Sequence, residues 1–249
     1  MSIPQLSIVV PAYNEERRLP DTLKALTGAL EKWPFSCEVL IVVEKSRDAT
    51  LEIARRAAGG DARFRVIAPG IQRGKGHAVR LGMLEARGEI DLFMDADLSV
   101  PLDEVPRLLA VFEQHPGAGV VIGSRKHAGS EILKRQSWMR QRMGESFNWL
   151  LRVMADISFR DTQCGFKAFR REAAQAVFSR QTIDGFAFDV ELLLLADRLG
   201  FEVIEVPVRW INSGDSRVRI VRDSLTMLRD AIKVRRMVDR RLPAGLSRA

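Results

Sequence analysis

Short apolar segments alternate with amphipathic segments along the first half of the chain, and this alternation limits the folds that the sequence can adopt. The apolar segments have the length and β-branched content of buried strands, and they are residues 6–11, 38–43, 63–67, 90–95 and 119–124. Between them, apolar residues recur at intervals of three and four, which predicts helices over residues 17–32, 48–58, 76–86 and 101–114. Strands that alternate with helices in this way predict an α/β fold, a mostly parallel sheet covered by helices on both faces.

The second half of the chain is organised differently. Residues 125–135 are polar and basic and predict a loop, while residues 136–155 form a long amphipathic stretch. The remaining elements are predicted as a helix near 171–178, an apolar segment at 183–200, a strand at 202–208 and a final helix from about 219 to 240. Because no repeat or low-complexity linker interrupts the chain, we expect one domain over residues 1–216, followed by a basic amphipathic helix and tail over residues 217–249.

The distribution of charge argues against a nucleic-acid partner. The net charge is +7, and residues 217–249 hold ten basic and three acidic side chains, so residues 1–216 are neutral. A second basic stretch, residues 125–152, leaves the rest of that body acidic. A nucleic-acid-binding protein would also present aromatic platforms, but the chain has a single Tyr and its Phe residues lack that spacing. The basic stretches therefore favour phosphate groups or an anionic surface as partners.

Hydropathy and cysteine content indicate where such a chain works. No apolar run approaches the roughly 20 residues that span a bilayer, and the first ten residues enter a strand pattern at once, which leaves no room for a signal peptide. Cys37 and Cys164 lie far apart and outside any CxxC motif, which favours a reducing compartment. We expect a cytoplasmic protein.

Two aspartates directly follow the fourth predicted strand, in the sequence Asp95-Ala96-Asp97, and Ser99 comes two residues later. Two carboxylates one residue apart at a strand end can both reach a hard divalent cation, and oxygen ligands of this kind suit Mg²⁺ or Mn²⁺. The alternative is a pair of turn or N-cap aspartates before a helix that starts near Pro101. The pattern alone leaves both possibilities open.

Polar segments after other strands add candidate ligands for a nucleotide. Glu15 can accept hydrogen bonds from a base or a ribose, or it can be an acid of the first helical turn. In Arg73-Gly74-Lys75-Gly76, the glycines allow close approach of the backbone, and Lys75 with the following helix N-terminus suits a diphosphate. Asp189 is a further candidate acid, with a role as a helix cap as its alternative.

Taken together, these segments resemble the family 2 glycosyltransferases of the GT-A fold, in the branch that transfers hexoses to polyprenyl phosphates. The resemblance covers roughly residues 5–217 and rests on motifs in the same order along the chain: VVPAYNEE (9–16), RGKGHAVRLGM (73–83), DADLS (95–99), IGSR (122–125), DTQCGFKAFRREAA (161–174), GFAFDVELL (185–193) and VPVRW (206–210). DTQCGFK and RGKG are most similar to the dolichyl-phosphate glucosyltransferase group of that branch.

The resemblance implies a GT-A Rossmann-like sheet and assigns roles residue by residue. A nucleotide-sugar donor, UDP-glucose first and GDP-mannose second, would be bound by Pro11, Tyr13, Glu15, Glu44, Lys75, Asp95, Ala96 and Arg217. Mg²⁺ or Mn²⁺ would be held by Asp95, Asp97 and Ser99, and the phosphate of a polyprenyl acceptor would meet Arg125, Lys134 and Arg135.

One departure from the family pattern concerns the donor base. The second strand of the family usually ends in Asp-Asp-Gly-Ser, whereas this chain reads Val43-Glu44-Lys45-Ser46. Glu44 can still accept a hydrogen bond from an N–H of uracil or guanine, but its side chain is one methylene longer than Asp. A second departure is that the loop between VPVRW and Ser216 is shorter than in the mannosyl enzymes.

The implied reaction is an inverting, metal-dependent displacement at the anomeric carbon, in which the metal at Asp95 and Asp97 stabilises the departing diphosphate. A phosphate acceptor is already mostly ionised near pH 7 and needs cations rather than a base. A hydroxyl acceptor on a soluble sugar or polyol, the first alternative, would need a carboxylate base, for which Asp161 and Asp189 are candidates. A nucleotidyltransferase is disfavoured by the order of the motifs, and a non-catalytic relative that binds nucleotide-sugars remains the alternative outside enzymes.

Membrane contact is expected without a spanning helix. The predicted C-terminal helix places Leu225, Leu228 and Ile232 on one face and basic residues on another, as in helices that lie on an anionic bilayer. The alternative is a helix packed on its own domain with a solvated basic edge. We therefore expect a protein peripherally associated with the cytoplasmic face of a membrane.

Overall fold

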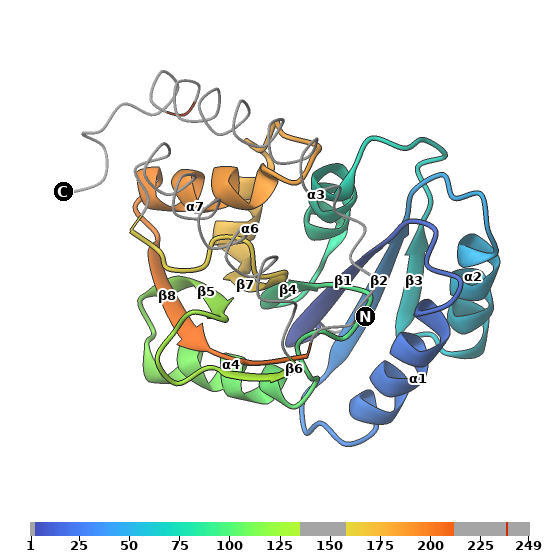
Figure 1. Cartoon of the computed structure of the whole chain (residues 1–249), viewed down its shortest axis with the longest axis horizontal. Helices are drawn as coiled ribbons and strands as arrows, with labels where there is room; N and C mark the ends of the chain where they lie inside the picture. Colours follow the sequence, from blue (N-terminus) through green and yellow to red (C-terminus); the bar gives the residue numbers. More distant parts are fainter. Residues whose placement is uncertain (1–2, 135–157, 212–237, 239–249) are drawn as a thin grey trace.

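The core of the molecule is a seven-stranded sheet with the strand order β3-β2-β1-β4-β7-β5-β8, seen in the computed structural model of the chain (Figure 1). The structure describes residues 3–134, 158–211 and 238. All neighbouring strands run parallel except β7, which is antiparallel to both β4 and β5. The expected α/β fold with a mostly parallel sheet is confirmed.

The predicted elements of the first half are present, with ends within a few residues of those expected. The strands are β1 (Leu6–Ala12), β2 (Cys37–Val43), β3 (Phe64–Ile67), β4 (Ile90–Met94) and β5 (Ala118–Ser124). The helices between them are α1 (Leu19–Leu30), α2 (Thr50–Gly60), α3 (Lys75–Glu85) and α4 (Glu104–Gln114). The second half adds β7 (Phe166–Arg170), α6 (Arg171–Phe178), α7 (Phe188–Arg198) and β8 (Glu202–Pro207).

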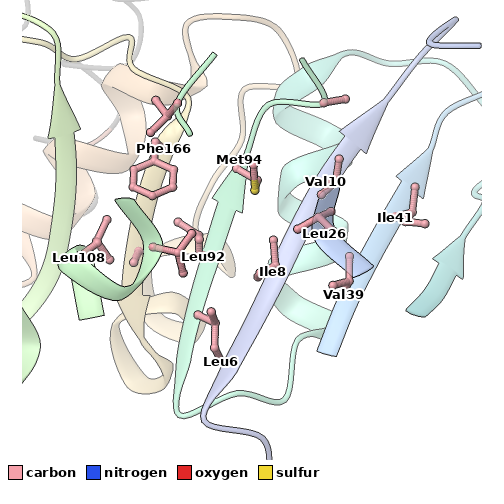
Figure 2. Packing of buried hydrophobic residues seen from close by; sticks show 14 of the residues in the cluster. Leu6, Ile8, Val10, Leu26, Val39, Ile41, Leu92, Met94, Leu108 and Phe166 are labelled. Atoms are coloured by element: carbon pink, nitrogen blue, oxygen red, sulfur yellow. The ribbon is translucent and has the colours of Figure 1, made fainter. Parts of the chain in front are cut away.

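Helices cover both faces of the sheet because successive strand residues point to opposite sides. On one face Ile8, Val10 and Leu92 pack with Leu26 of α1 and Leu108 of α4, and Figure 2 shows this cluster at close range. On the other face α3, α6 and α7 cover Val9, Val42 and Phe93 (Figure 1). The sheet is therefore buried on both sides, which explains its near-continuous apolar strands.

Two segments differ from the sequence-based expectation. The polar DTQCGFKAF segment contains β7, which is inserted between β4 and β5. The predicted loop over residues 125–135 contains β6 (Glu131–Lys134), which pairs in parallel with β9 (Arg209–Ile211) as a separate two-stranded sheet. Both strands are too short and too polar to stand out in a single sequence, and each forms because a distant strand provides its hydrogen bonds.

The C-terminal helix and the amphipathic stretch at 136–155 lie outside the described residues, as does the proposed boundary at residue 216. Val238, which is described, is 3% exposed and packs in the cluster beneath α3, α6 and α7. Within the described part of the chain, no helix combines the length and apolar character needed to cross a bilayer.

Candidate active site

A cavity of about 540 Å³ opens at the carboxyl ends of the strands. It lies where the strand order reverses, because β1 has β2 on one side and β4 on the other, and open α/β sheets bind ligands at such a point. Eleven predicted site residues line it: Pro11, Tyr13, Glu15, Glu44, Lys75, Asp95, Ala96, Asp97, Ser99, Arg125 and Asp189. The fold thus brings together motifs that are more than 170 residues apart in sequence.

The turn after β1 is fastened to the turn after β2. The backbone N–H of Asn14 donates to Ser46 Oγ at 3.0 Å, and that of Glu15 donates to Thr50 Oγ1 at 2.7 Å. Asn14 adopts a positive φ of 52°, a conformation that Asn tolerates better than most residues. These bonds fix the rim of the cavity on the side of the predicted nucleoside site.

Arg18 connects two of the predicted acids. Its Nε and Nη2 donate to the carboxylate of Glu15 at 2.7 and 2.6 Å, and its Nη1 lies 3.7 Å from Asp97 Oδ2. Arg18 was not among the predicted site residues, because nothing in the sequence around it distinguishes it from other arginines. The structure shows that Glu15 presents its carboxylate to this cation.

Asp95 lines the cavity beside Lys75. Its Oδ1 pairs with Lys75 Nζ at 2.5 Å, and the side chains of Lys75 and Asp95 are 21% and 35% exposed. Burial works against the charge on Lys75, but Asp95 and Asp189 outweigh it and raise the pKa of this amine. Gly165 packs directly on Asp95, since a Cβ at this glycine would come within 2.2 Å of Asp95 Oδ2. Gly165 is therefore part of the site, although it was not selected from the sequence.

Asp189 lies at the N-terminal end of α7 and is buried with Lys167 of β7. The Nζ of Lys167 donates to Asp189 Oδ1 at 2.5 Å and to the carbonyl oxygen of Cys164, and the Lys167 side chain is fully buried. Burial raises the pKa of Asp189, while Lys167 and Lys75 act against this shift. The carboxylate that was expected as a possible base is thus held by a cation inside the protein.

Arg125 and Asp161 form a buried bidentate ion pair at another part of the cavity. Arg125 Nε and Nη2 donate to the two oxygens of Asp161 at 2.7 and 2.8 Å, and its backbone N–H adds a third bond. Burial alone would raise the pKa of Asp161, yet the adjacent guanidinium holds this pKa well below its usual range. The guanidinium also lies 5.7 Å from the ring centroid of Trp210.

Glu44 ends β2 and its side chain is buried, with its carboxylate directed at the RGKG loop. The N–H groups of Arg73 and Gly74 donate to Glu44 Oε1 at 3.1 and 3.0 Å. His77 Nδ1 lies 3.0 Å from the same oxygen. The oxygens that were expected to accept from a nucleobase therefore contact the protein's own loop.

The carboxylates of the cavity suit a divalent cation. Asp95 and Asp97 both line the cavity, and Asp97 Oδ1 accepts the N–H of Ser99 at 3.0 Å, which fixes the turn after β4. Among the described residues, no three His, Cys, Asp or Glu side chains form a complete metal site. Two carboxylates with remaining positions for phosphate oxygens and water are the donor set that Mg²⁺ or Mn²⁺ commonly takes.

Three predicted site residues remain without a described side-chain position. Lys134 ends β6 on a part of the chain where only the backbone is described, and Arg135 and Arg217 lie outside the described residues. The cavity also contains residues that the sequence analysis did not select, among them Gln72, Gln163, Phe186 and Trp210. The signal for Trp210 was present, because it ends the VPVRW motif.

Sequence comparison identifies relatives over most of the chain. Residues 7–178 match the family described as Glycosyl transferase family 2. The chain is 38% identical over 241 residues to a dolichyl-phosphate beta-glucosyltransferase of Drosophila melanogaster, a match that covers 92% of this chain and 74% of that protein. It is 36% identical over 242 residues to the protein of that name from Homo sapiens, with 93% and 75% of the two chains covered.

Solved structures with the same fold include glucosyl-3-phosphoglycerate synthase from Mycobacterium tuberculosis. Its complex with UDP superposes with a TM-score of 0.68 at 21% identity and covers 97% of this chain and 82% of that chain. Its complex with Mn²⁺, UDP-glucose and phosphoglyceric acid gives a TM-score of 0.67 at 19% identity, with 97% and 81% covered. At this identity the likeness establishes the GT-A fold.

Proposed function

Because the chain belongs to glycosyl transferase family 2, we propose that it transfers glucose from UDP-glucose to the phosphate of a dolichyl-type polyprenyl lipid. The chain is a nucleotide-sugar-dependent glycosyltransferase, as its family and its relatives show. GDP-mannose is the second candidate donor. The observation that carries the proposal is one cavity lined by Asp95, Asp97, Lys75 and the partly buried Arg125.

The donor end of the cavity is formed by the turns after β1 and β4. Asp95 and Asp97 would hold Mg²⁺ or Mn²⁺ together with the donor diphosphate, and the cation would neutralise charge on the departing nucleoside diphosphate. Lys75 is fixed beside Asp95 and supplies a second positive charge there. Glu15 and Tyr13 line the same cavity and would contact the nucleoside.

The acceptor end of the cavity contains Arg125 and Trp210. Two nitrogens of the Arg125 guanidinium, Nε and Nη2, donate to Asp161, so the group is held in one orientation. Nη1, which makes neither of these bonds, would donate to a phosphate oxygen. Asp161 acts as a positioning residue for Arg125. The attacking oxygen of a phosphate monoester is already ionised near pH 7, so the displacement at the anomeric carbon, with inversion, requires no base.

The pairing of both candidate bases favours a phosphate acceptor over a hydroxyl acceptor. A hydroxyl must lose a proton to a carboxylate as it attacks. Asp161 is chelated by Arg125, and Asp189 is bonded to Lys167 at 2.5 Å. The lowered pKa of Asp161 makes it a weak base, and Lys167 occupies one oxygen of Asp189 inside the protein.

An apolar surface beside the cavity supports a lipid acceptor and contact with a membrane. Ile132, Leu133 and Ile211, on the small β6·β9 sheet, are 38%, 58% and 38% exposed. Trp210 of the same sheet lines the cavity. A polyprenyl chain or the bilayer that holds it would cover these side chains, and this supports our proposal that the enzyme associates peripherally with the cytoplasmic face of a membrane.

The test is a transfer assay with radiolabelled donors. Purified protein receives UDP-glucose or GDP-mannose, MnCl₂ or MgCl₂, and polyprenyl phosphate in detergent, and label in the organic phase is counted. Transfer from UDP-glucose into the lipid fraction is expected. Label that enters only water-soluble acceptors would contradict the phosphate acceptor, and transfer from GDP-mannose alone would contradict the donor.

A further inference from the structure

We infer that Glu44 is a positioning residue, whose buried carboxylate holds the RGKG loop and thereby sets Lys75 beside Asp95 in the cavity. The RGKG loop here means residues 73–76. The identity of the ligand that Lys75 contacts, a nucleoside diphosphate, rests on the proposed function. The hydrogen bonds between Glu44 and the loop do not depend on that proposal. This role differs from recognition of the donor base, which the position of Glu44 at the end of β2 had led us to expect.

The carboxylate of Glu44 contacts the loop and His77, which directly follows it. The Glu44 side chain is 3% exposed, and the N–H of Gly74 lies 3.0 Å from both Oε1 and Oε2. Arg73 N–H and His77 Nδ1 approach Oε1 at 3.1 and 3.0 Å. Hydrogen bonds to an ionised carboxylate are about twice as strong as neutral ones. Glu44 therefore satisfies two backbone donors before α3 begins, together with a side chain from the first turn of that helix.

The opposite side of the loop is closed by the segment before α7. The φ of Gly74 is +134°, and a Cβ at this residue would lie 2.5 Å from the carbonyl oxygen of Asp184. The Asp184 carboxylate pairs with Arg73 at 2.6 Å, and its carbonyl accepts the N–H of His77. A Cβ at Gly76 would come equally close to the carbonyl oxygen of Ile183. The loop thus lies between Glu44 and residues 183–184.

These contacts on both sides of the loop determine the position of Lys75. On one side of Lys75, Gly74 donates a hydrogen bond to Glu44, and on the other side Gly76 packs against Ile183. The Nζ of Lys75 contacts Asp95 Oδ1. Without the Glu44 carboxylate, the N–H groups of Arg73 and Gly74 lose a shared acceptor, and the turn that carries Lys75 is held from one side only. The cation is then less well placed beside Asp95.

The first experiment measures the loop itself and needs no substrate. Amide hydrogen exchange of residues 72–77 is compared between wild type, Glu44→Gln and Glu44→Ala. Loss of bonds to a charged acceptor should speed exchange of these amides by about ten- to a hundredfold in Glu44→Ala, with an intermediate value for Glu44→Gln. Glu38→Gln is the matched control, because Glu38 belongs to the same strand and accepts the N–H of Arg87 at 2.8 Å. It should speed exchange at residues 87–88 and leave the loop unchanged.

The second experiment separates positioning from base recognition. Affinities for UDP and GDP are measured by calorimetry with MnCl₂ present. If Glu44 acts through the loop, both nucleotides should lose affinity by the same factor, about tenfold, because the lost contact concerns the diphosphate that they share. Where wild type binds both nucleotides, a fall for one of them alone would overturn the inference. Unchanged loop exchange in both variants would overturn it in every case. Glu44→Gln conserves volume and gives the answer if Glu44→Ala does not fold. If wild type binds neither nucleotide, the proposed donor is wrong, while the exchange experiment still decides the role of Glu44.

Discussion

Asp97 is one of the two carboxylates that follow β4 and line the cavity. Arg18 Nη1 lies 3.7 Å from Asp97 Oδ2, and Lys75 Nζ lies 2.5 Å from Asp95 Oδ1. We predict that Asp97→Asn lowers kcat/KM by at least ~100-fold, because a neutral amide is a poor metal ligand and the metal contributes several kcal/mol at the transition state. Mn²⁺ binding, measured by electron paramagnetic resonance, should weaken in parallel. Near-normal turnover at low MnCl₂ would contradict the assignment.

Gly165 offers a test of the same site through packing alone. A methyl group at this position would overlap the carboxylate of Asp95. We predict that Gly165→Ala displaces Asp95 and reduces kcat by about tenfold or more, since misplacement by about 1 Å at a reacting centre has effects of this size. Gly185→Ala is the control, because it also borders the cavity but has open space at its Cβ. Equal activity of the two variants would show that Asp95 adapts without loss.

At the residue level, the sequence predicted which side chains meet but not how they are paired. The parallel sheet brings together positions that follow a strand or precede a helix, and four of the predicted residues are at such positions: Asp95, Asp97, Glu15 and Lys75. The partners Arg18 and Gly165 could not be selected, because their roles depend on distances between segments that the sequence does not encode locally.

The end of β5 and the segment before β7 meet through Arg125 and Asp161, and this joint supports the acceptor prediction. Arg125→Lys replaces a planar group with several donors by a single ammonium that cannot hold Asp161 in bidentate fashion. We expect the KM for polyprenyl phosphate to rise by about tenfold while the KM for UDP-glucose is unchanged. Arg63→Lys is the control, because it alters a similar ion pair with Asp61 outside the cavity lining. It should change neither the KM for polyprenyl phosphate nor the KM for UDP-glucose. A rise in donor KM alone would place Arg125 in the donor site instead.

Strand β4 carries a buried carboxyl whose titration should affect stability. Burial raises the pKa of Asp91 to about 7, although Arg171 and Ser7 act against this shift. In the unfolded chain an Asp titrates near 3.9. Because the folded-state pKa is the higher one, Asp91 destabilises the fold increasingly as pH rises from about 4 to about 7, and the penalty is constant above that range.

Asp91→Asn should remove this penalty. Relative to wild type, we expect the variant to gain about 2–3 kcal/mol in free energy of unfolding between pH 5 and pH 8. Urea denaturation at both pH values measures the difference. Asp61→Asn is the control: because Arg63 holds the pKa of Asp61 below its usual value, this variant should lose stability by the same amount at both pH values. A difference for Asp91→Asn that is the same at both pH values would exclude ionisation of Asp91 as its cause.

Among the elements, the strands and helices of the first half were predictable, as were α6 and β8, whereas β6, β7 and β9 were not. Near-continuous apolar runs mark β1, β2, β4 and β5 because both faces of the sheet are buried. Strand β7 contains the buried Lys167, whose charge is compensated by Asp189 of α7, so hydropathy conceals its central position. Strand β6 exists through its pairing with β9, about 80 residues away in the chain.

At the scale of the whole molecule, exposed apolar side chains of the β6·β9 sheet lie beside the cavity, as expected if a membrane meets this end. The cavity, the β6·β9 sheet and Trp210 adjoin one another. Ile3, which is 66% exposed, precedes β1 at the opposite ends of the parallel strands. The ten basic residues of 217–249 lie outside the described chain, so their part in membrane contact stays a prediction.

Leu133→Asp tests the membrane proposal on the described surface. Leu133 is 58% exposed, so an aspartate there should leave the core intact, but it would place a charge against lipid. Burial of a leucine side chain contributes about 1.5–3 kcal/mol, so sedimentation with anionic vesicles should fall by about tenfold or more. Ile3→Asp adds the same charge at the other end and should sediment as wild type. Because salt screens basic residues but not apolar contact, the deficit of Leu133→Asp should persist at 0.5 M NaCl. An equal loss in both variants would instead indicate simple charge repulsion and would remove the β6·β9 sheet from the membrane contact.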